Sequence, residues 1–434
     1  MNNLNFKKFT LTNKATVIVQ HISWVKSLCV YFYVGAGPRY ETKDTAGLAH
    51  FLEHMLFEGT KRFPSAKKLA EYIEGVGGQS GARTYKEYVA YYAKVPYKCS
   101  HVAFDYLTEI LFHSTLEYNA IEKEKRIVLE ELKRKEDNPE VEIWDLWMEW
   151  VWGSSQWLGR STLGGEKTID AISKAKLHKY MKNLYTPANM VISVIGNLSF
   201  IKVKDEVLKS VGKIKSNPKS LRVKQPVFKQ KKIRVRIIPS ELKQNQVLLG
   251  FVTGVSYKHV DYFPTLLLAD ILNSGVNSRL FHKLVYDLGI AYSVWTANWT
   301  FSDTGLFYFQ GGFSTENIKK ALEVIILELN SLKREKVSNK ELSEAKTKRQ
   351  ADLIFSLESP DALANFYASQ QFIEKRILSS DQISAKIDKV TSNDVQKAAR
   401  KYLIGKNLSL LIKGPVGSTF ANAFERILSK AFGD

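Results

Sequence analysis

The chain repeats one order of structural signals in its two halves, and this repetition constrains its fold more than any other feature. Residues 177–199 (LHKYMKNLYTPANMVISVIGNLS) and 395–417 (VQKAARKYLIGKNLSLLIKGPVG) each read as an amphipathic helix, a short turn and an apolar strand. Upstream, each half has a helix, a polar turn and a long second helix, and each opens on strand-like alternation. We therefore expect an α+β fold of two duplicated domains, each a mostly antiparallel sheet packed with helices.

The segment between the halves is strongly basic. From residue 207 to residue 240 there is no Asp or Glu, whereas Lys and Arg recur and Pro218 and Pro226 interrupt the run. It lacks the periodic amphipathicity of a helix. The chain of 434 residues also exceeds the roughly 250–300 residues at which a single core stops growing. We expect an N-terminal domain at 1–215, a linker at 216–227 and a homologous domain at 228–434.

The formal net charge of +19 raises the question of an anionic partner. The basic segment has no regularly spaced aromatics, so we expect no nucleic-acid binding and favour attraction of acidic substrates or an acidic partner subunit. No run of about 18 apolar residues occurs, so we expect no membrane span. The N-terminal residues lack the apolar core of a secretory signal, and the only cysteines are Cys29 and Cys99. These features predict a cytoplasmic protein.

One short stretch, AHFLEHMLFEG at residues 49–59, places histidines and glutamates where a core helix is expected. His50 and His54 are four residues apart, so on a helix their imidazoles project from one face, as two ligands of one Zn²⁺ require. Glu53 lies one turn from His50, where its carboxylate can reach a water on the metal. A lone buried histidine is usually a satisfied core residue, whereas two at ligand spacing with a carboxylate between them predict a metal site.

A catalytic zinc site needs a third protein ligand, and the helix expected at residues 116–140 offers two candidates. Glu124 and Glu131 fall on its apolar stripe with Ile121 and Val128. Surface ion pairs account for the other glutamates of this helix, but a carboxylate turned inward needs a cation or hydrogen-bond donors to offset its desolvation. Spacing alone does not rank Glu124 against Glu131.

The second half of the chain lacks this cluster. Its corresponding helix, FPTLLLADILNSG, contains no histidine, and a direct alignment of the long helices places Ala351 opposite Glu131. A role in building the fold would be needed in both halves. The cluster therefore indicates chemistry that is confined to the N-terminal half.

Five blocks, in order along nearly the whole chain, resemble the inverzincin metallopeptidases, the family of pitrilysin, insulin-degrading enzyme and mitochondrial processing peptidase. They are GLAHFLEHMLFEGT, YIEGVGGQSGARTYKEYVAYYAKV, EKEKRIVLEEL, LYTPANMVISVIGNLS and SRLFHKLVYDLGIAYSV. The resemblance implies half of a clamshell per chain, with one Zn²⁺ per chain. It also implies a zinc-dependent endopeptidase that hydrolyses extended or unfolded peptides held in a closed chamber.

The resemblance also assigns roles to the acidic and histidine residues. His50, His54 and Glu131 would bind the zinc, which ranks Glu131 ahead of Glu124 as the third ligand. Glu53 would act as the general base of peptide hydrolysis. Glu124 would orient a histidine ligand from outside the coordination sphere.

Substrate would lie along an edge strand and extend its sheet through main-chain hydrogen bonds. The residues of that strand are Gly81, Ala82, Arg83, Thr84 and Tyr85. The family usually has Asn-Ala where this chain has Gly81-Ala82, so the resemblance implies the loss of one side-chain contact to substrate.

Tyr292 would help to stabilise the oxyanion of the reaction. Active relatives often carry an Arg seven residues before this Tyr, and that position is Val285 here. Arg279 is nearby but matches a different block, and we do not assign it the role. Tyr292 is then expected to act alone, or a partner subunit supplies the missing function.

Relatives of this length complete the chamber by pairing, so the resemblance implies a homodimer or a heterodimer with a paralogue. The alternative is a non-catalytic or regulatory assembly subunit of a peptidase-like complex, as the respiratory-complex core proteins of this family are. Those proteins have typically lost part of the ligand set. This chain keeps all of it, which favours the endopeptidase.

Overall fold

The computed structural model describes residues 6–216, 223–273 and 275–433, which form two compact units by their internal contacts. Unit 1 contains Met1–Arg134, Ser154–Lys224 and Phe355–Ser379. Unit 2 contains Lys135–Gly153, Gln225–Ile354 and Ser380–Asp434. Within the described residues, no helix has both the length and the apolar character needed to cross a bilayer.

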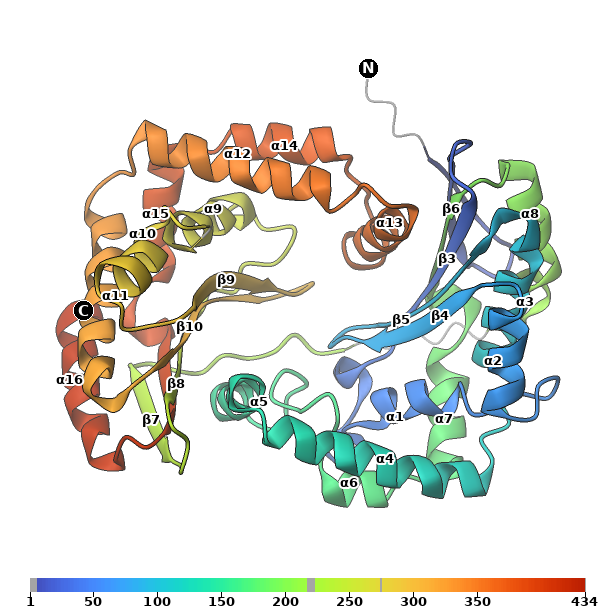
Figure 1. Cartoon of the computed structure of the whole chain (residues 1–434), viewed down its shortest axis with the longest axis horizontal. Coiled ribbons are helices and arrows are strands. Elements are labelled where there is room, and N and C mark those ends of the chain that lie inside the picture. Colours follow the sequence, from blue (N-terminus) through green and yellow to red (C-terminus); the bar gives the residue numbers. More distant parts are fainter. Residues whose placement is uncertain (1–5, 217–222, 274, 434) are drawn as a thin grey trace. The chain divides into compact units, whose positions relative to one another are not determined.

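Unit 1 is built on a six-stranded sheet in the order β1-β2-β6-β3-β5-β4 (Figure 1). All neighbours in this sheet are antiparallel except β2 and β6, which are parallel. β3 and β6 are apolar along nearly their whole length because both faces of the sheet are covered there. The strands are β1 (Lys7–Thr10), β2 (Thr16–His21), β3 (Ser27–Val34), β4 (Gln79–Thr84), β5 (Val89–Pro96) and β6 (Met190–Gly196).

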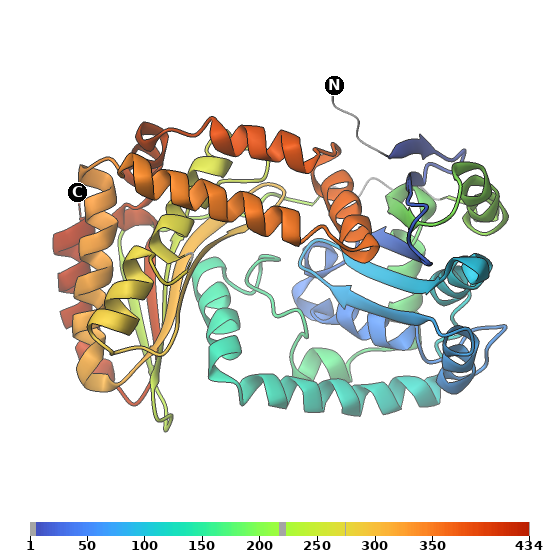
Figure 2. The same ribbon diagram turned by 45° about the horizontal axis from the view of Figure 1, so that its top comes forward.

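Helices cover both faces of this sheet. Val30 and Phe32 of β3 enter the main core of the unit, whereas Tyr31 and Tyr33 point to the opposite face and pack in a cluster with α13. Figures 1 and 2 show α13 on one face and α2, α3 and α8 on the other. The helices are α1 (Leu48–Met55), α2 (Ala66–Glu74), α3 (Ser100–Phe112), α4 (Tyr118–Glu136), α6 (Glu166–Asp170), α7 (Lys174–Leu184), α8 (Phe200–Lys209) and α13 (Pro360–Glu374).

Unit 2 has a five-stranded sheet in the order β7-β11-β8-β10-β9, again antiparallel except for one parallel pair, β7 and β11. The strands are β7 (Arg234–Pro239), β8 (Asn245–Val252), β9 (Val294–Thr300), β10 (Gly305–Phe313) and β11 (Leu408–Gly414). The helices are α5 (Pro139–Trp152), α9 (Tyr262–Asn273), α10 (Arg279–Phe281), α11 (Ile318–Arg334), α12 (Asn339–Phe355), α14 (Ser380–Asp388), α15 (Ser392–Tyr402) and α16 (Ala421–Phe432).

The strand positions confirm the predicted duplication and the predicted α+β class. Strands β2, β3 and β6 begin at residues 16, 27 and 190, and β7, β8 and β11 begin at 234, 245 and 408, each 218 residues later. In both sheets the first strand of this trio pairs in parallel with the last. The two sheets are therefore copies of one plan.

Each unit also includes one helix from the other half of the sequence. Helix α5 packs on β8 and β11 of unit 2, and α13 packs on β3 and β6 of unit 1. One of the boundaries between the units falls between Lys224 and Gln225, inside the linker expected at 216–227, half of which (217–222) lies outside the described residues. The division at 1–215 and 228–434 stays a prediction about the sequence repeat.

Candidate metal centre

Helix α1 presents His50 and His54 because its apolar residues fix its orientation. Phe51, Leu52 and Met55 are buried in the core of unit 1. The stripe that carries the two histidines is thereby turned out of that core, and their ring centroids lie 4.7 Å apart. The spacing of four residues thus brings the imidazoles together, as the helical geometry predicts.

The start of α1 is held by a buried carboxylate that the sequence pattern did not reveal. Glu41 accepts hydrogen bonds from the backbone N–H groups of Gly47 (3.1 Å) and Ala49 (2.7 Å), which a helix start otherwise leaves unsatisfied. Burial raises the pKa of Glu41 to about 7, although these N–H groups and the charges of Arg160 and Lys86 oppose the rise. Glu41 positions the first turn of the helix that carries His50.

Helix α4 supplies the acidic side chains that face α1. Ile121 and Val128 of α4 are buried, and Glu124 lies with them on the inward stripe at only 4% exposure. Glu131 follows two turns later on the same stripe. The carboxylates therefore lie on the packed side of α4, where the apolar periodicity predicted them.

The structure brings His50, His54 and Glu131 to one point. Their ligand atoms all lie within 4.8 Å of one another. Glu131 Oε2 is 3.7 Å from His50 Nε2 and 3.6 Å from His54 Nε2. Glu124 lies behind this group, with Oε2 at 3.0 Å from His54 Nδ1. The structure thus separates the two glutamates that spacing alone left unranked.

This arrangement fits a zinc ion by its donor set. Two imidazole nitrogens and one carboxylate oxygen match catalytic zinc sites, which use three protein ligands. Ligand atoms about 2.0–2.1 Å from a tetrahedral ion lie roughly 3.3 Å from one another, and the separations of 3.6 and 3.7 Å are too long for hydrogen bonds. Because Glu124 accepts a hydrogen bond from His54 Nδ1–H, the Nε2 atom of that ring is the one that faces the cluster.

The charges of the cluster are strongly coupled. Burial lowers the pKa of His54, but the hydrogen bond with Glu124, the close approach of Glu131 and the charges of both carboxylates outweigh it and raise the pKa to about 9. Burial raises the pKa of Glu124, yet His54 and Lys123 together bring it below its ordinary value. The close approach of His54 Nε2, 3.6 Å from Oε2, is the main cause that lowers the pKa of Glu131. Both carboxylates therefore favour the ionised form, which is the form that binds a metal or accepts a hydrogen bond from a histidine ligand.

Glu53 is a separate carboxylate beside the cluster. Burial raises its pKa above the ordinary value, against the opposing effects of the Thr84 hydrogen bond and the charge of His54. Thr84 Oγ1 donates to Glu53 Oε2 at 2.5 Å and fixes its orientation. A carboxylate with a raised pKa next to a metal site has the properties of a proton acceptor. Thr84 was predicted only as a substrate contact, because the sequence does not show which helix its strand faces.

The predicted substrate residues lie on and just after β4, an edge of the unit 1 sheet. Among the described residues β4 pairs with β5 alone, so its other edge has no partner strand. Ala82 and Thr84 face α1, whereas Gly81 and Arg83 face the side of α13, because the pairing of β4 with β5 alternates. Tyr85 follows the strand and packs in the α13 cluster.

Tyr292 belongs to unit 2, where its side chain is 96% exposed. Its catalytic role stays a prediction. Arg279 already forms ion pairs, since its guanidinium donates to the carboxylates of Glu341 (2.7 and 3.1 Å) and Glu328 (3.4 Å). Arg279 therefore functions in holding α10 to α11 and α12, which agrees with leaving it out of the site.

Unit 2 has an ion pair between the two helices that correspond to α1 and α4. Asp270 of α9 accepts a hydrogen bond from Arg349 Nε at 2.8 Å. The offset of 218 residues seen in the strands places Arg349 opposite Glu131, whereas the alignment of the long helices placed Ala351 there. In unit 2 a partly buried salt bridge thus joins the helices where unit 1 has its histidines and glutamates.

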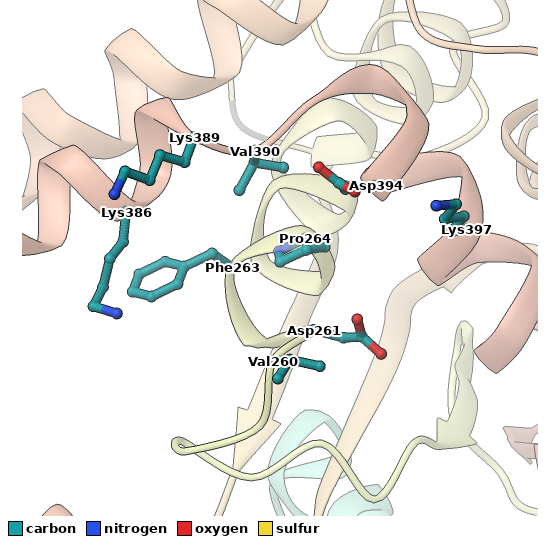
Figure 3. A pocket seen from close by; sticks show the side chains of 9 residues that line it. All are labelled: Val260, Asp261, Phe263, Pro264, Lys386, Lys389, Val390, Asp394 and Lys397. Atoms are coloured by element: carbon teal, nitrogen blue, oxygen red, sulfur yellow. The ribbon is translucent and has the colours of Figure 1, made fainter.

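A hollow of about 370 Å³ in unit 2 offers no comparable ligand set (Figure 3). Its two carboxylates are engaged, Asp261 with Lys401 (2.8 Å) and Asp394 with Thr391 (2.7 Å). In the described part of the chain, a metal-capable group of three His, Cys, Asp or Glu residues occurs only at the α1–α4 cluster.

A duplicated α+β fold with an H-x-x-E-H helix facing a glutamate-bearing helix defines the inverted zincin class. Residues 16–164 match the family model described as insulinase (peptidase family M16), and residues 171–349 match that of the M16 inactive domain. The uncharacterized zinc protease YmxG of Bacillus subtilis is 32% identical over 412 residues, covering 95% of this chain and 99% of the relative. An uncharacterized zinc protease of Rickettsia felis is 28% identical over 417 residues, covering 95% and 98%. The chain belongs to peptidase family M16.

Two solved structures share the fold. A protease from Helicobacter pylori superposes with a TM-score of 0.86 at 21% identity, covering 94% of this chain and 99% of the other. A peptidase M16 inactive domain from Pseudomonas fluorescens gives a TM-score of 0.88 at 19% identity, covering 96% and 99%. The duplicated plan described above is therefore the fold of these proteins as well.

Proposed function

We propose that the protein is a zinc-dependent endopeptidase that hydrolyses extended or unfolded peptides, with one Zn²⁺ per chain. The observation that carries this proposal is the convergence of His50, His54 and Glu131 beside a separate carboxylate, Glu53, whose pKa is raised. The relatives named as zinc proteases support the metal and the reaction class.

The residues of unit 1 have separate roles in the proposed hydrolysis. Bound zinc would supply Lewis acidity, lowering the pKa of a bound water towards about 7 and polarising the peptide carbonyl. Glu53, oriented by Thr84, takes the proton of the attacking water and passes it to the leaving amine. Glu124 holds the His54 ring in the tautomer and orientation that the metal requires. The unpaired edge of β4 holds the peptide extended through main-chain hydrogen bonds.

We further propose that the chain acts in the cytoplasm as a homodimer or as a heterodimer with a paralogue, with the substrate held in a closed chamber. Tyr292 donates a hydrogen bond to the oxyanion in this proposal. The second candidate is a non-catalytic assembly subunit, which is favoured by Val285 in the place of the family Arg and by the match to the M16 inactive domain.

Metal content and peptide cleavage separate the two candidates. The purified chain is expected to carry stoichiometric zinc and to cleave a quenched fluorescent peptide in a chelator-sensitive manner. Glu53→Gln should keep the zinc and abolish cleavage, and Glu131→Gln should lose the zinc. Glu130→Gln is the matched control, because Glu130 is an exposed neighbour that pairs with Lys133. A chain that binds zinc but cleaves no peptide, alone or with a paralogue, would identify the assembly subunit.

A further inference from the structure

The face of β4 that points to the side of α13 carries an unusual combination at the proposed substrate edge. Gly81 has no side chain, and Tyr92 is its direct partner on β5. A Cβ atom built on Gly81 would lie 2.8 Å from the Tyr92 hydroxyl and 2.9 Å from two of its ring carbons. The phenol of Tyr92 therefore fills the space that a side chain at position 81 would occupy, and it brings its hydroxyl to the edge of the sheet.

The ring of Tyr92 is held in this place by the neighbouring ring of Tyr31. It stacks on Tyr31 with centroids 5.3 Å apart and an interplanar angle of 20°. Tyr31 is in turn anchored, because its hydroxyl donates to Asp361 of α13 at 3.1 Å. An edge glycine covered by a cross-strand aromatic ring is a known way to keep such a strand ordered.

Arg83 is the next residue of β4 on the same face. It is exposed, and its guanidinium lies over the ring of Tyr85, 5.2 Å from the centroid. Tyr85 packs against Tyr88 with centroids 4.7 Å apart, so the platform below the guanidinium is itself supported. Among the residues that the structure describes, no carboxylate lies within ion-pair distance of Arg83, which leaves its N–H donors available.

These two donors line the path of a peptide that extends the sheet. A strand added to β4 would run about 4.8 Å away, and every second side chain would stand on the face of Arg83 and Tyr92. Because Gly81 and Arg83 are two residues apart, their positions on this face are separated by roughly 7 Å. One side chain of the added strand can therefore lie next to both the guanidinium and the phenol hydroxyl.

We propose that this face of β4 selects peptides with an acidic side chain, whose carboxylate accepts hydrogen bonds from the Arg83 guanidinium and the Tyr92 hydroxyl. The inference rests on the proposed peptidase function and names its substrate class. An anionic substrate also matches the formal net charge of +19. Arg83 and Tyr92 thus determine which side chains the substrate strand can carry. The hydrolytic residues lie on the opposite face of β4, where Thr84 donates a hydrogen bond to Glu53.

The test is a set of quenched peptides of one neutral sequence in which each position in turn is Asp, Asn or Lys. At one position we expect kcat/KM to be about fivefold or more higher for Asp than for Asn, with Lys lowest. Arg83→Ala should remove the preference for Asp, and Arg83→Glu should reverse it in favour of Lys. Tyr92→Phe should reduce the ratio of Asp to Asn without changing the rank of Lys.

Arg126→Glu is the matched control, because it makes the same change of charge at an exposed arginine of α4. It should leave the Asp preference within about twofold of the parent chain. Zinc content and circular dichroism of each variant show that it is folded. Equal kcat/KM for Asp, Asn and Lys at every position would overturn the inference and leave the peptidase standing. A preference that survives Arg83→Glu would also overturn it, whereas failure to cleave any peptide would instead reject the proposed function.

Discussion

At the scale of single residues, the cluster depends on a carboxylate that does not bind the metal itself. Glu124 Oε2 lies 3.0 Å from His54 Nδ1, and Glu124 is 4% exposed. Replacing it with Gln removes the charge that fixes the tautomer and basicity of His54. We expect the affinity for zinc to fall by about 10–100-fold, measured by competition with a chelating indicator.

Glu122→Gln is the control for this prediction. Glu122 lies on the same helix but pairs with Lys125 at 2.9 Å and has no contact with the histidines. Its zinc affinity should match the parent chain. If Glu124→Gln retained the parent affinity, Glu124 would have no part in orienting His54.

The ionisation of Glu41 makes the stability of the fold depend on pH. Its pKa is about 7 in the folded chain, above the ordinary value of 4.5. A raised acid pKa means that folding favours the protonated form. The stabilising contribution is therefore complete below about pH 4.5 and is lost as the pH rises through 7. Glu41→Gln mimics the neutral acid, so its stability should rise relative to the parent between pH 5 and pH 8, by on the order of 3 kcal/mol at most.

Denaturant midpoints of the two chains at pH 5, 6, 7 and 8 measure this difference. Glu74→Gln, on the exposed surface of α2, is the control, and the difference in stability between it and the parent chain should not change with pH. A Glu41→Gln chain that is less stable than the parent by the same amount at every pH would show that Glu41 is ionised in the folded state.

At the scale of elements, Trp147 is the side chain by which α5 enters the interior of unit 2. Trp147 is fully buried, and its Nε1–H donates to the Ser409 carbonyl at 3.3 Å. A Cβ on Gly250 of β8 would collide with the indole ring. Gly250→Ala should therefore lower the free energy of unfolding by about 1–3 kcal/mol.

A double-mutant cycle identifies the cause of that loss. In a Trp147→Leu background, the added cost of Gly250→Ala should largely disappear, because the ring that collides is gone. Gly212→Ala is the control, since a Cβ there has its nearest neighbour at 3.4 Å. Additive effects of Trp147→Leu and Gly250→Ala in thermal unfolding would contradict this packing.

The sequence predicts those elements whose pattern is local and misses those that are chosen by tertiary packing. The alternation of the opening strands and the i, i+4 spacing of His50 and His54 are properties of a few neighbouring residues, so the fold class and the histidine pair were predictable. Glu131 and Glu124 share one helical stripe, and only the position of α1 distinguishes them. The bond from Thr84 to Glu53 joins a strand to a helix 31 residues away in sequence.

At the scale of the whole molecule, the two halves of the sequence are tied by exchanged segments. Unit 1 requires α13, whose Tyr367 and Ala368 pack against the sheet beside Tyr31 and Tyr33. Unit 2 in turn contains α5 from the first half. This exchange is invisible in the sequence, because nothing in the local pattern of either helix indicates which half of the chain it packs against.

The exchange predicts how a chain cut between Lys224 and Gln225 behaves. Residues 1–224 made alone lack α13 and expose the aromatic face of their sheet, so we expect that fragment to aggregate. Co-expressed with residues 225–434, it should be soluble and should co-purify with the second fragment through a single affinity tag.

Deleting residues 355–379 from the second fragment should abolish the rescue, because these residues complete unit 1. Deleting only residues 421–432 (α16), which lie wholly in unit 2, tests whether any truncation has the same effect. With that second fragment, which still contains α13, the first fragment should stay soluble. A first fragment that is soluble and monomeric by itself would show that α13 is dispensable for its fold.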